Sequence, residues 1–314
     1  MTTTVVREDV ATLDTVRERG AVQAVVSQGI RGLSVPDGRG SYSGLDADIA
    51  RAVAAAALGD PAAVEWLPTD PAERLTRLVS GAADVATCNL SWTLGREAAH
   101  PVLFAGVTCY DGEGFLVRAV EGISRPEQLA GRRVAIQAGT TTADNLAAWF
   151  GARGLEVEAV AYATPAEALA GYVDGGSAAY VLDRIALAGA RATLPRPADH
   201  VVLETAISRE PMALAVRDDD PGWFRVCRWV LQLLVGAEAA VREGGTARSA
   251  ADLADRHGRL LGLGSGWAHR VLDAVGTYGD VYERNLGPAS GLDVTRGANA
   301  LWIDGGLHYP LPLH

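Results

Sequence analysis

The feature that most constrains the fold of this chain is an alternation of short apolar runs with helix-forming segments. Residues 21–27 (AVQAVVS) and 64–68 (VEWLP) are typical of strands, whereas residues 45–59 and 71–81 are typical of helices, the first of which ends at Gly59. Strands that alternate with helices favour an α/β sheet, and ligands of such sheets bind beyond the carboxyl ends of the strands. We therefore expect the functional residues where the predicted strands end.

One such place is the stretch of residues 83–96, ADVATCNLSWTLGR, in which a β-rich run leads into a polar turn. Small polar side chains fill the turn and an arginine follows them: Cys88, Asn89, Ser91, Thr93 and Arg96. A guanidinium offers a planar fork of donors that suits a carboxylate, and the backbone amides of a turn add further donors. The stretch therefore predicts an anion-holding turn.

The same order of elements recurs in the middle of the chain. The sequence RRVAIQAGTTTADNLAAWFG predicts a strand, a glycine–threonine turn and a helix that opens at Thr140–Thr142. Helix amino termini carry unpaired N–H groups and the positive end of the helix dipole, so this is a second anion-favouring turn, with Thr140 and Thr141 as candidates. Further on, residues 178–182 (AAYVL) predict a strand, and Asp183 stands at its carboxyl end.

The order of these segments indicates two α/β lobes. Strand-like segments meet at a bend at Gly112–Gly114, and residues 207–217 predict a strand that returns to the first lobe. The chain thus crosses between the lobes near residues 111–117 and again near 207–213. We expect lobe 1 to comprise residues 1–112 and 212–314, with a helical and tail extension at its C-terminal end, and lobe 2 to comprise residues 113–211.

A cleft between two such lobes would bring the charged candidates onto one ligand. Arg96 and the Thr140–Thr141 turn complement a carboxylate, and Asp183 complements an ammonium group. Leu33 of a glycine-rich loop is a candidate wall of the cleft, although loops of this kind more often only connect elements. By charge complementarity, the sequence predicts a receptor for an α-amino acid.

Composition excludes several other classes of function. All 28 basic residues are arginine. Without lysine the chain can form neither a lysine Schiff base nor a pyridoxal-phosphate aldimine, and it lacks the lysine that a P-loop requires. A net charge of −10 without a basic cluster argues against nucleic acid as a partner. The sequence contains no run of eighteen apolar residues, which a membrane-spanning helix would require.

The cysteines and histidines give no metal or disulfide pattern. The three cysteines are odd in number and not closely spaced, and the six histidines show no ligand spacing, so we expect neither a metal site nor a cofactor. Cys88 leaves two interpretations open. A lone cysteine is usually a small buried apolar residue, but Arg96 nearby would lower the pKa of the thiol and make it a candidate nucleophile.

The amino terminus bears on location. Charged residues at Arg7, Glu8 and Asp9 interrupt the apolar run that a secretory leader requires. This predicts a cytoplasmic protein, or a periplasmic or extracellular one if a leader has been removed.

Several longer segments resemble one family. VSQGI, GLDADIARAVAAAALGD, NLSWTLGRE, QAGTTTADNLA and YGDVYERNLGP are similar to the solute-binding proteins of polar amino-acid ABC transporters, in particular the general L-amino-acid binders, and the likeness covers nearly the whole chain. It implies a type II periplasmic-binding fold and, if the protein is exported, an ABC permease as partner. It further implies that Thr93 and Arg96, with Ser91 adjoining, bind the ligand carboxylate, that the amides of Thr140 and Thr141 assist, and that Asp183 binds the α-amino group.

Three positions depart from the family pattern. Leu33 stands where the general amino-acid binders usually have an aromatic residue, Cys88 where close relatives tend to have arginine, and Ala178 where an aspartate is usual. These departures affect the recognition of the ligand's side chain and leave the α-amino-acid clamp intact.

Two functions therefore compete. The first is reversible capture of a free L-α-amino acid by a solute-binding or sensor protein. The second is a cofactor-independent enzyme on the same fold, a lyase, dehydratase or cyclase that acts on an amino acid or a related carboxylate. Cyclohexadienyl dehydratase, which resembles the amino-acid-binding proteins in fold, is a precedent. The absence of a leader favours the enzyme, whereas the lack of a recognisable acid–base pair favours binding.

Overall fold

The computed structural model describes residues 11–138 and 140–314. The charged amino terminus on which the prediction about a leader depends, and Gly139 of the glycine–threonine turn, lie outside these residues. The chain divides into unit 1, Met1–Cys109 with Pro211–His314, and unit 2, Tyr110–Glu210. It therefore crosses between the units at Cys109–Tyr110 and at Glu210–Pro211. The lobe bounds predicted from the sequence put these crossings slightly later, at 112–113 and 211–212.

Unit 1 is built on a sheet with the strand order β4-β1-β5-β12-β6. These strands are β1 (Val22–Val26), β4 (Val64–Pro68), β5 (Val85–Ala86), β6 (Val102–Asp111) and β12 (Glu210–Arg217). β1 runs parallel to both β4 and β5, with Val22 opposite Val64 and Ala24 opposite Val85, whereas β12 runs antiparallel to β5. The carboxyl ends of β1, β4 and β5 therefore meet at one edge of the sheet. A separate hairpin pairs β2 (Val35–Pro36) with β3 (Tyr42–Ser43).

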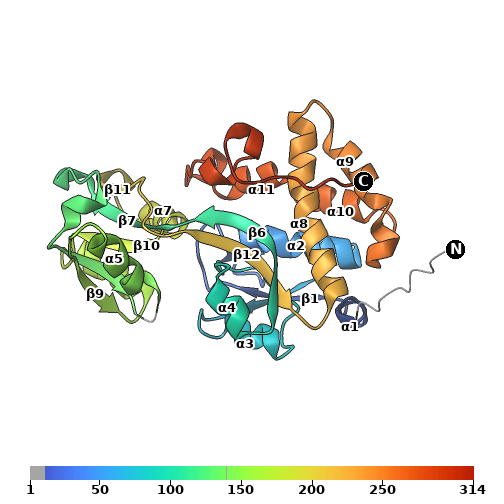
Figure 1. Cartoon of the computed structure of the whole chain (residues 1–314), viewed down its shortest axis with the longest axis horizontal. Helices are drawn as coiled ribbons and strands as arrows, with labels where there is room; N and C mark the ends of the chain where they lie inside the picture. Colours follow the sequence, from blue (N-terminus) through green and yellow to red (C-terminus); the bar gives the residue numbers. More distant parts are fainter. Residues whose placement is uncertain (1–10, 139) are drawn as a thin grey trace. The chain divides into compact units, whose positions relative to one another are not determined.

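Helices cover this sheet and extend beyond it. They are α1 (Ala11–Arg19), α2 (Leu45–Leu58), α3 (Arg74–Val79), α4 (Leu94–Ala99), α8 (Pro221–Arg242), α9 (Ala247–Asp255), α10 (Trp267–Val275) and α11 (Tyr278–Asn285). α2 is buried along most of its length against α1, α8 and α10, because its alanines let neighbouring helices approach closely. Gly59 ends α2 in the left-handed conformation, as expected for a helix stop. In Figure 1 the 22-residue α8 lies beside α9 and α10.

The sheet of unit 2 has the strand order β11-β7-β10-β8-β9. Its elements are β7 (Glu113–Arg118), β8 (Arg133–Gln137), β9 (Glu158–Tyr162), β10 (Ala179–Asp183), β11 (His200–Val202), α5 (Thr142–Gly151), α6 (Pro165–Val173) and α7 (Arg184–Thr193). β8, β9 and β10 are parallel, and β7 runs antiparallel to β10 and β11. Phe115 and Phe150 pack on one side of this sheet, and Tyr172 and Tyr180 on the other.

Short 3₁₀ turns connect the elements of both units. They are η1 (Ala119–Glu121), η2 (Pro126–Leu129), η3 (Pro197–Asp199), η4 (Gly258–Leu261), η5 (Pro288–Ser290), η6 (Gly297–Asn299) and η7 (Trp302–Asp304). The last three belong to the C-terminal extension of unit 1. There Arg296 pairs with Glu238 at 2.8 Å and lies over the rings of Tyr278 and Tyr282, so the glycine-rich tail is anchored to α8 and α11.

Two predicted elements begin later than the sequence pattern suggested. The helix expected from residue 71 starts at Arg74, after a turn at residues 71–73. The strand expected from residue 207 starts at Glu210, because Ile207 donates its N–H to the carbonyl of Glu113 and Ser208 Oγ accepts the N–H of Glu113. Hydrogen bonds to the main chain of Glu113 thus replace the ladder at the start of that segment.

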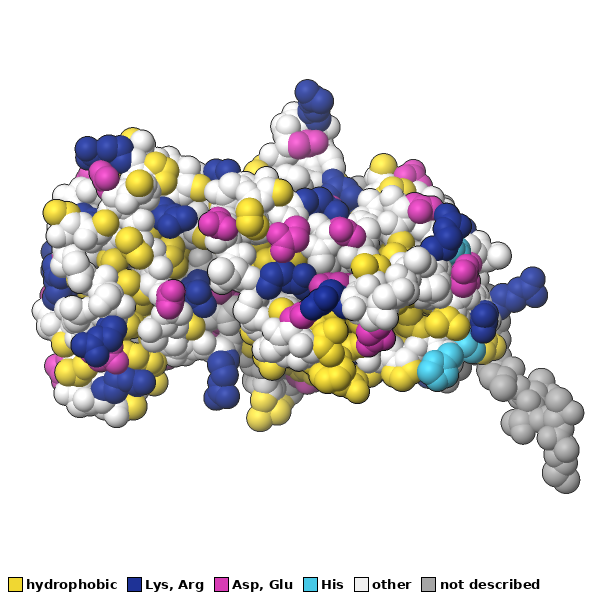
Figure 2. Space-filling model, turned by 90° about the horizontal axis from the view of Figure 1, so that it is seen from above, with side chains coloured by type: hydrophobic (Ala, Val, Ile, Leu, Met, Phe, Trp, Pro, Cys, Tyr) yellow, Lys and Arg dark blue, Asp and Glu magenta, His cyan; other side chains and the backbone are white. Residues whose placement is uncertain are grey.

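Two observations concern the charge of the surface and the length of the helices. On the face shown in Figure 2, arginine and acidic side chains are interspersed. Within residues 11–138 and 140–314, no helix is both long and apolar enough to cross a bilayer.

Candidate functional site

The predicted carboxylate turn lies at the edge of unit 1 where the parallel strands end. Thr93 caps α4, and its Oγ1 accepts the N–H of Arg96 at 3.2 Å. The guanidinium of Arg96 turns back and donates from Nη1 to the carbonyl of Ser91 at 2.6 Å. The turn is also joined to β12, because Trp92 N–H donates to the carbonyl of Pro211. The structure therefore brings Ser91, Thr93 and Arg96 together.

A buried arginine that the sequence analysis missed supports this turn from inside unit 1. Arg74 is only 4% exposed. Its Nη1 donates to Oδ1 of Asn89 at 2.9 Å, its Nη2 to Oγ of Ser27 at 3.1 Å, and its Nε to the carbonyl of Thr69 at 3.4 Å. Ser27, Thr69 and Asn89 follow β1, β4 and β5, so one guanidinium ties together the carboxyl ends of three strands. The available signal was that Arg74 lies on the same helix face as Leu78, which packs in the core.

A second buried ionisable side chain lies near Arg74. Asp46, in the first turn of α2, is 1% exposed, and its Oδ2 has no hydrogen-bond partner among the described residues. Burial raises the pKa of Asp46 to about 7, although the charge of Arg74 opposes the rise. Asp46 thus carries a proton up to nearly neutral pH.

The glycine–threonine turn lies at the corresponding edge of unit 2. Thr140 Oγ1 donates to the carbonyl of Gln137 at 2.9 Å and lies 3.0 Å from Oγ1 of Thr142. Thr141 is exposed at the N-cap of α5 and makes no side-chain capping bond there. A helix amino terminus with an exposed cap is suited to accept an anion.

Asp183 ends β10 at the same edge of unit 2. It occupies the N-cap position of α7, but its side chain makes no capping bond. Asp111 takes that task, since its Oδ2 accepts the N–H of Ile185 at 3.0 Å. Burial raises the pKa of Asp111 to about 6, against the bonds from the backbone of Ile185 and Gly112, and the charge of Glu210 raises it further. The half-buried Asp183 carboxylate is therefore not needed to cap α7.

Glu113, a further residue not anticipated from the sequence, lies beside Asp183. It is 5% exposed, and its two oxygens accept from Thr142 Oγ1 at 2.5 Å and from Asn145 Nδ2 at 2.8 Å. Burial raises the pKa of Glu113, while these two hydrogen bonds act to lower it. Because Glu113 lies in the bend predicted at Gly112–Gly114, nothing in the sequence indicated that its side chain contacts Thr142, 29 positions away.

Comparison with known proteins identifies the family. The model of the bacterial extracellular solute-binding proteins, family 3, matches residues 22–255. This chain belongs to that family. It is 38% identical to the general L-amino acid-binding periplasmic protein AapJ of Rhizobium johnstonii, a match that covers 96% of this chain and 92% of the relative. The glutamate/glutamine/aspartate/asparagine-binding protein BztA of Rhodobacter capsulatus is 37% identical over 96% of this chain and 93% of its own.

A solved structure agrees with this assignment. An ABC-transporter periplasmic binding protein from Brucella ovis with glutathione bound superposes with a TM-score of 0.88 at 37% identity, covering 96% of this chain and 99% of the other. The predicted family and the two-lobed periplasmic-binding fold are thus confirmed.

All three positions where this family 3 protein departs from the expected pattern, Leu33, Cys88 and Ala178, are buried. Leu33 is 0% exposed, so the expectation that it walls a ligand cleft is wrong: its side chain has no free surface. Cys88 is 1% exposed and packs with Val25, Leu75 and Phe104. Burial raises the pKa of the Cys88 thiol to about 11, outweighing the charges of Arg74 and Arg96, so of the two interpretations left open the structure favours the small buried apolar residue. Burial therefore has a larger effect on the pKa of Cys88 than the two guanidinium groups have.

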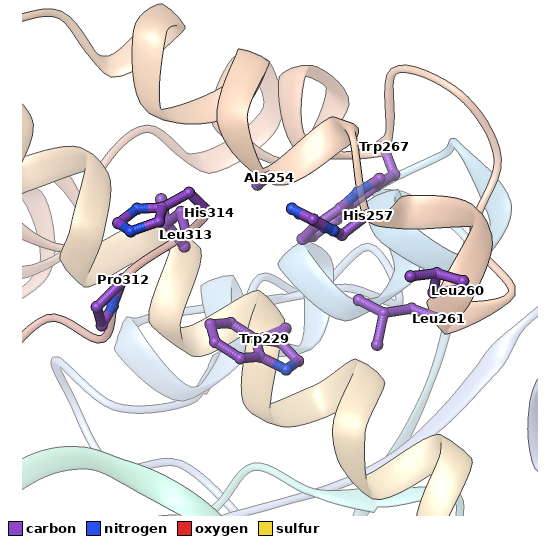
Figure 3. A pocket seen from close by; sticks show the side chains of 9 residues that line it. All are labelled: Trp229, Ala254, His257, Leu260, Leu261, Trp267, Pro312, Leu313 and His314. Carbon is purple, nitrogen blue, oxygen red and sulfur yellow. The ribbon is translucent and has the colours of Figure 1, made fainter. Parts of the chain in front are cut away.

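Unit 1 also contains an apolar cavity away from the strand ends. It measures about 270 Å³, and Figure 3 shows Trp229, Trp267 and Leu313 among the side chains that line it. Its lining includes no aspartate, glutamate or arginine, so it cannot complement both charges of an amino acid. Within the described part of the chain, no group of three or more histidine, cysteine, aspartate or glutamate side chains is arranged to hold a metal ion.

Proposed function

We propose that this protein binds a free L-α-amino acid as the solute-binding component of an ABC transporter. The carboxylate is bound by Arg96, with the polar groups of Asn89, Ser91 and Thr93 beside it and the amides of Thr140 and Thr141 assisting. The ammonium group is bound by Asp183. One observation carries the proposal: the strand-end edge of unit 1 presents a guanidinium fixed by Ser91, whereas at that of unit 2 the carboxylate of Asp183 ends β10.

The names of the relatives support this ligand class. AapJ is named for general L-amino acids, and BztA for four amino acids with acidic or amide side chains. AapJ is also named as periplasmic, and we extend that location and an ABC permease partner to this chain as part of the proposal.

A second ligand is favoured by the Brucella ovis structure, which holds glutathione. The γ-glutamyl end of glutathione carries a free α-carboxylate and a free α-ammonium group on one carbon, as an amino acid does. The same pair, Arg96 and Asp183, would therefore hold a γ-glutamyl peptide by its head. The enzymatic alternative rested on Cys88 as a candidate nucleophile together with the predicted absence of a leader, and the buried thiol gives the first of these no support.

Calorimetry with purified protein tests the proposal. The ligands are the common L-amino acids, their D-enantiomers and glutathione, and the variant is Arg96→Ala. Loss of a charge-assisted contact to the carboxylate should weaken binding by about 2–4 kcal/mol. Arg39→Ala, an exposed arginine of unit 1, is the control and should bind as the wild type does. Equal affinity of Arg96→Ala and wild type would place the carboxylate elsewhere.

A further inference from the structure

Two carboxylates face each other across a strand pair of unit 2. In the antiparallel pairing of β7 with β10, Glu113 is the direct partner of Asp183. Residues directly opposite in such a pair lie on the same face of the sheet, with Cβ atoms about 5 Å apart. Like charges in this position repel each other and destabilise a sheet. A positive charge at the same edge, from the protein or from a ligand, offsets this repulsion.

The hydrogen bonds that Glu113 accepts favour its ionised form, whereas burial raises its pKa. Thr142 and Asn145 each donate to a different oxygen of the side chain, and a carboxylate accepts at both oxygens. The main chain is held as well, since its N–H donates to Ser208 Oγ at 3.0 Å and its carbonyl accepts from Ile207 at 2.8 Å. Every polar atom of Glu113 is thus fixed, and the residue is too buried to contact a ligand directly.

Through Thr142 the carboxylate also reaches the glycine–threonine turn. Thr142 Oγ1 donates to Glu113 and lies 3.0 Å from Oγ1 of Thr140. The same side chain that adds negative charge beside Asp183 therefore holds the turn at the start of α5.

We propose that Glu113 determines the specificity of the unit 2 edge: its fixed negative charge makes that edge select ligands with an ammonium group, and its hydrogen bonds position the glycine–threonine turn. The inference rests on the proposed function, because it names which part of an amino acid the edge recognises. Glu113 acts through charge and through Thr142, without touching the ligand.

The test compares an amino acid with its des-amino analogue, which keeps the carboxylate and side chain but carries hydrogen in place of the ammonium group. For the wild type and Glu113→Gln, calorimetry gives the ratio of the two dissociation constants. At an assumed distance of about 7 Å and an effective dielectric constant of about 35, a unit charge changes the affinity for the ammonium group roughly tenfold. We therefore expect the preference for the amino acid to fall roughly tenfold in Glu113→Gln.

Glu121→Gln is the matched control. Glu121 is a partly buried glutamate of unit 2, paired with Arg118 at 2.9 Å, that lies beyond the other end of β7. Its substitution should leave the preference unchanged. Glu113→Asp keeps the charge on a shorter side chain. It should therefore lower the affinity for both ligands alike and retain the preference for the amino acid.

The outcomes separate the inference from the proposed function. If the wild type binds no amino acid, the proposed function fails, whatever Glu113 does. If the wild type prefers the amino acid and Glu113→Gln prefers it equally, or if Glu121→Gln loses as much preference, only the inference is overturned. Should Glu113→Gln not fold, Glu113→Asp decides, because loss of the preference with the charge retained would contradict a role for that charge.

Discussion

Arg74 is an arginine whose donors are all directed inward. Its guanidinium holds Ser27, Thr69 and Asn89, and therefore the ends of three strands. We predict that Arg74→Gln lowers the free energy of unfolding by about 2–4 kcal/mol, since acceptors buried with a charge lose their donor. Hydrogen exchange should increase at residues 88–93 in the ligand-free protein. Arg118→Gln, which removes bonds to Ser177 in unit 2, is the control and should leave exchange at residues 88–93 unchanged.

Asp46 makes stability depend on pH in a direction opposite to most carboxylates. Its pKa is raised from 3.8 to about 7, so the folded state binds the proton more tightly than the unfolded state. The resulting stabilisation is complete below the unfolded pKa and is lost as the pH rises through the folded pKa. Asp46→Asn cannot undergo this loss. Relative to the wild type, its free energy of unfolding should therefore rise by about 2–4 kcal/mol as the pH increases from about 4 to about 8.

Urea unfolding at a series of pH values measures this difference. If the unfolding free energies of wild type and Asp46→Asn run parallel across the series, the carboxyl group of Asp46 titrates normally.

At the scale of elements, local patterns were sufficient where a segment's structure depends on its own residues. The strand at residues 64–68 and the helix ending at Gly59 were predicted from apolar pattern and stop signal. The polar turn before Arg96 was likewise found from its residue types. Arg74 and Glu113, which support the strand-end edges of the two units, could not be predicted in this way. They act through contacts with residues far away in the sequence. Burial, which removes Leu33 and Cys88 from the candidate list, is also set by distant elements.

The start of α2 allows a test at this scale. Gly44 is the N-cap residue with φ 125°, and a Cβ there would lie 2.2 Å from the carbonyl oxygen of Leu33. We predict that Gly44→Ala lowers the unfolding free energy by about 3 kcal/mol or more, because both strain and a backbone clash oppose it. Gly38→Ala has positive φ but open space, so it should cost about 1 kcal/mol. Thermal denaturation of the two variants should rank them in that order.

For the whole molecule, the two chain crossings give the expected response to ligand. A ligand held by Arg96 of unit 1 and Asp183 of unit 2 is fully engaged only when both units contact it, so binding should favour a closed arrangement. Small-angle scattering should show a smaller radius of gyration with saturating amino acid than without it. Arg96→Ala at the same ligand concentration should show no such change. A wild-type radius that does not respond to ligand would contradict a site shared by the two units.

The place of β12 in unit 1 has a consequence for how the chain is made. β12 lies between β5 and β6, yet the ribosome synthesises it only after the whole of Tyr110–Glu210. Unit 2 is an uninterrupted segment and can collapse as soon as it emerges, whereas the sheet of unit 1 must wait with a missing interior strand. The nascent chain therefore acquires its inserted unit first and completes the surrounding one last, so protection of β1 and β5 amides should appear only after residue 217 has left the exit tunnel.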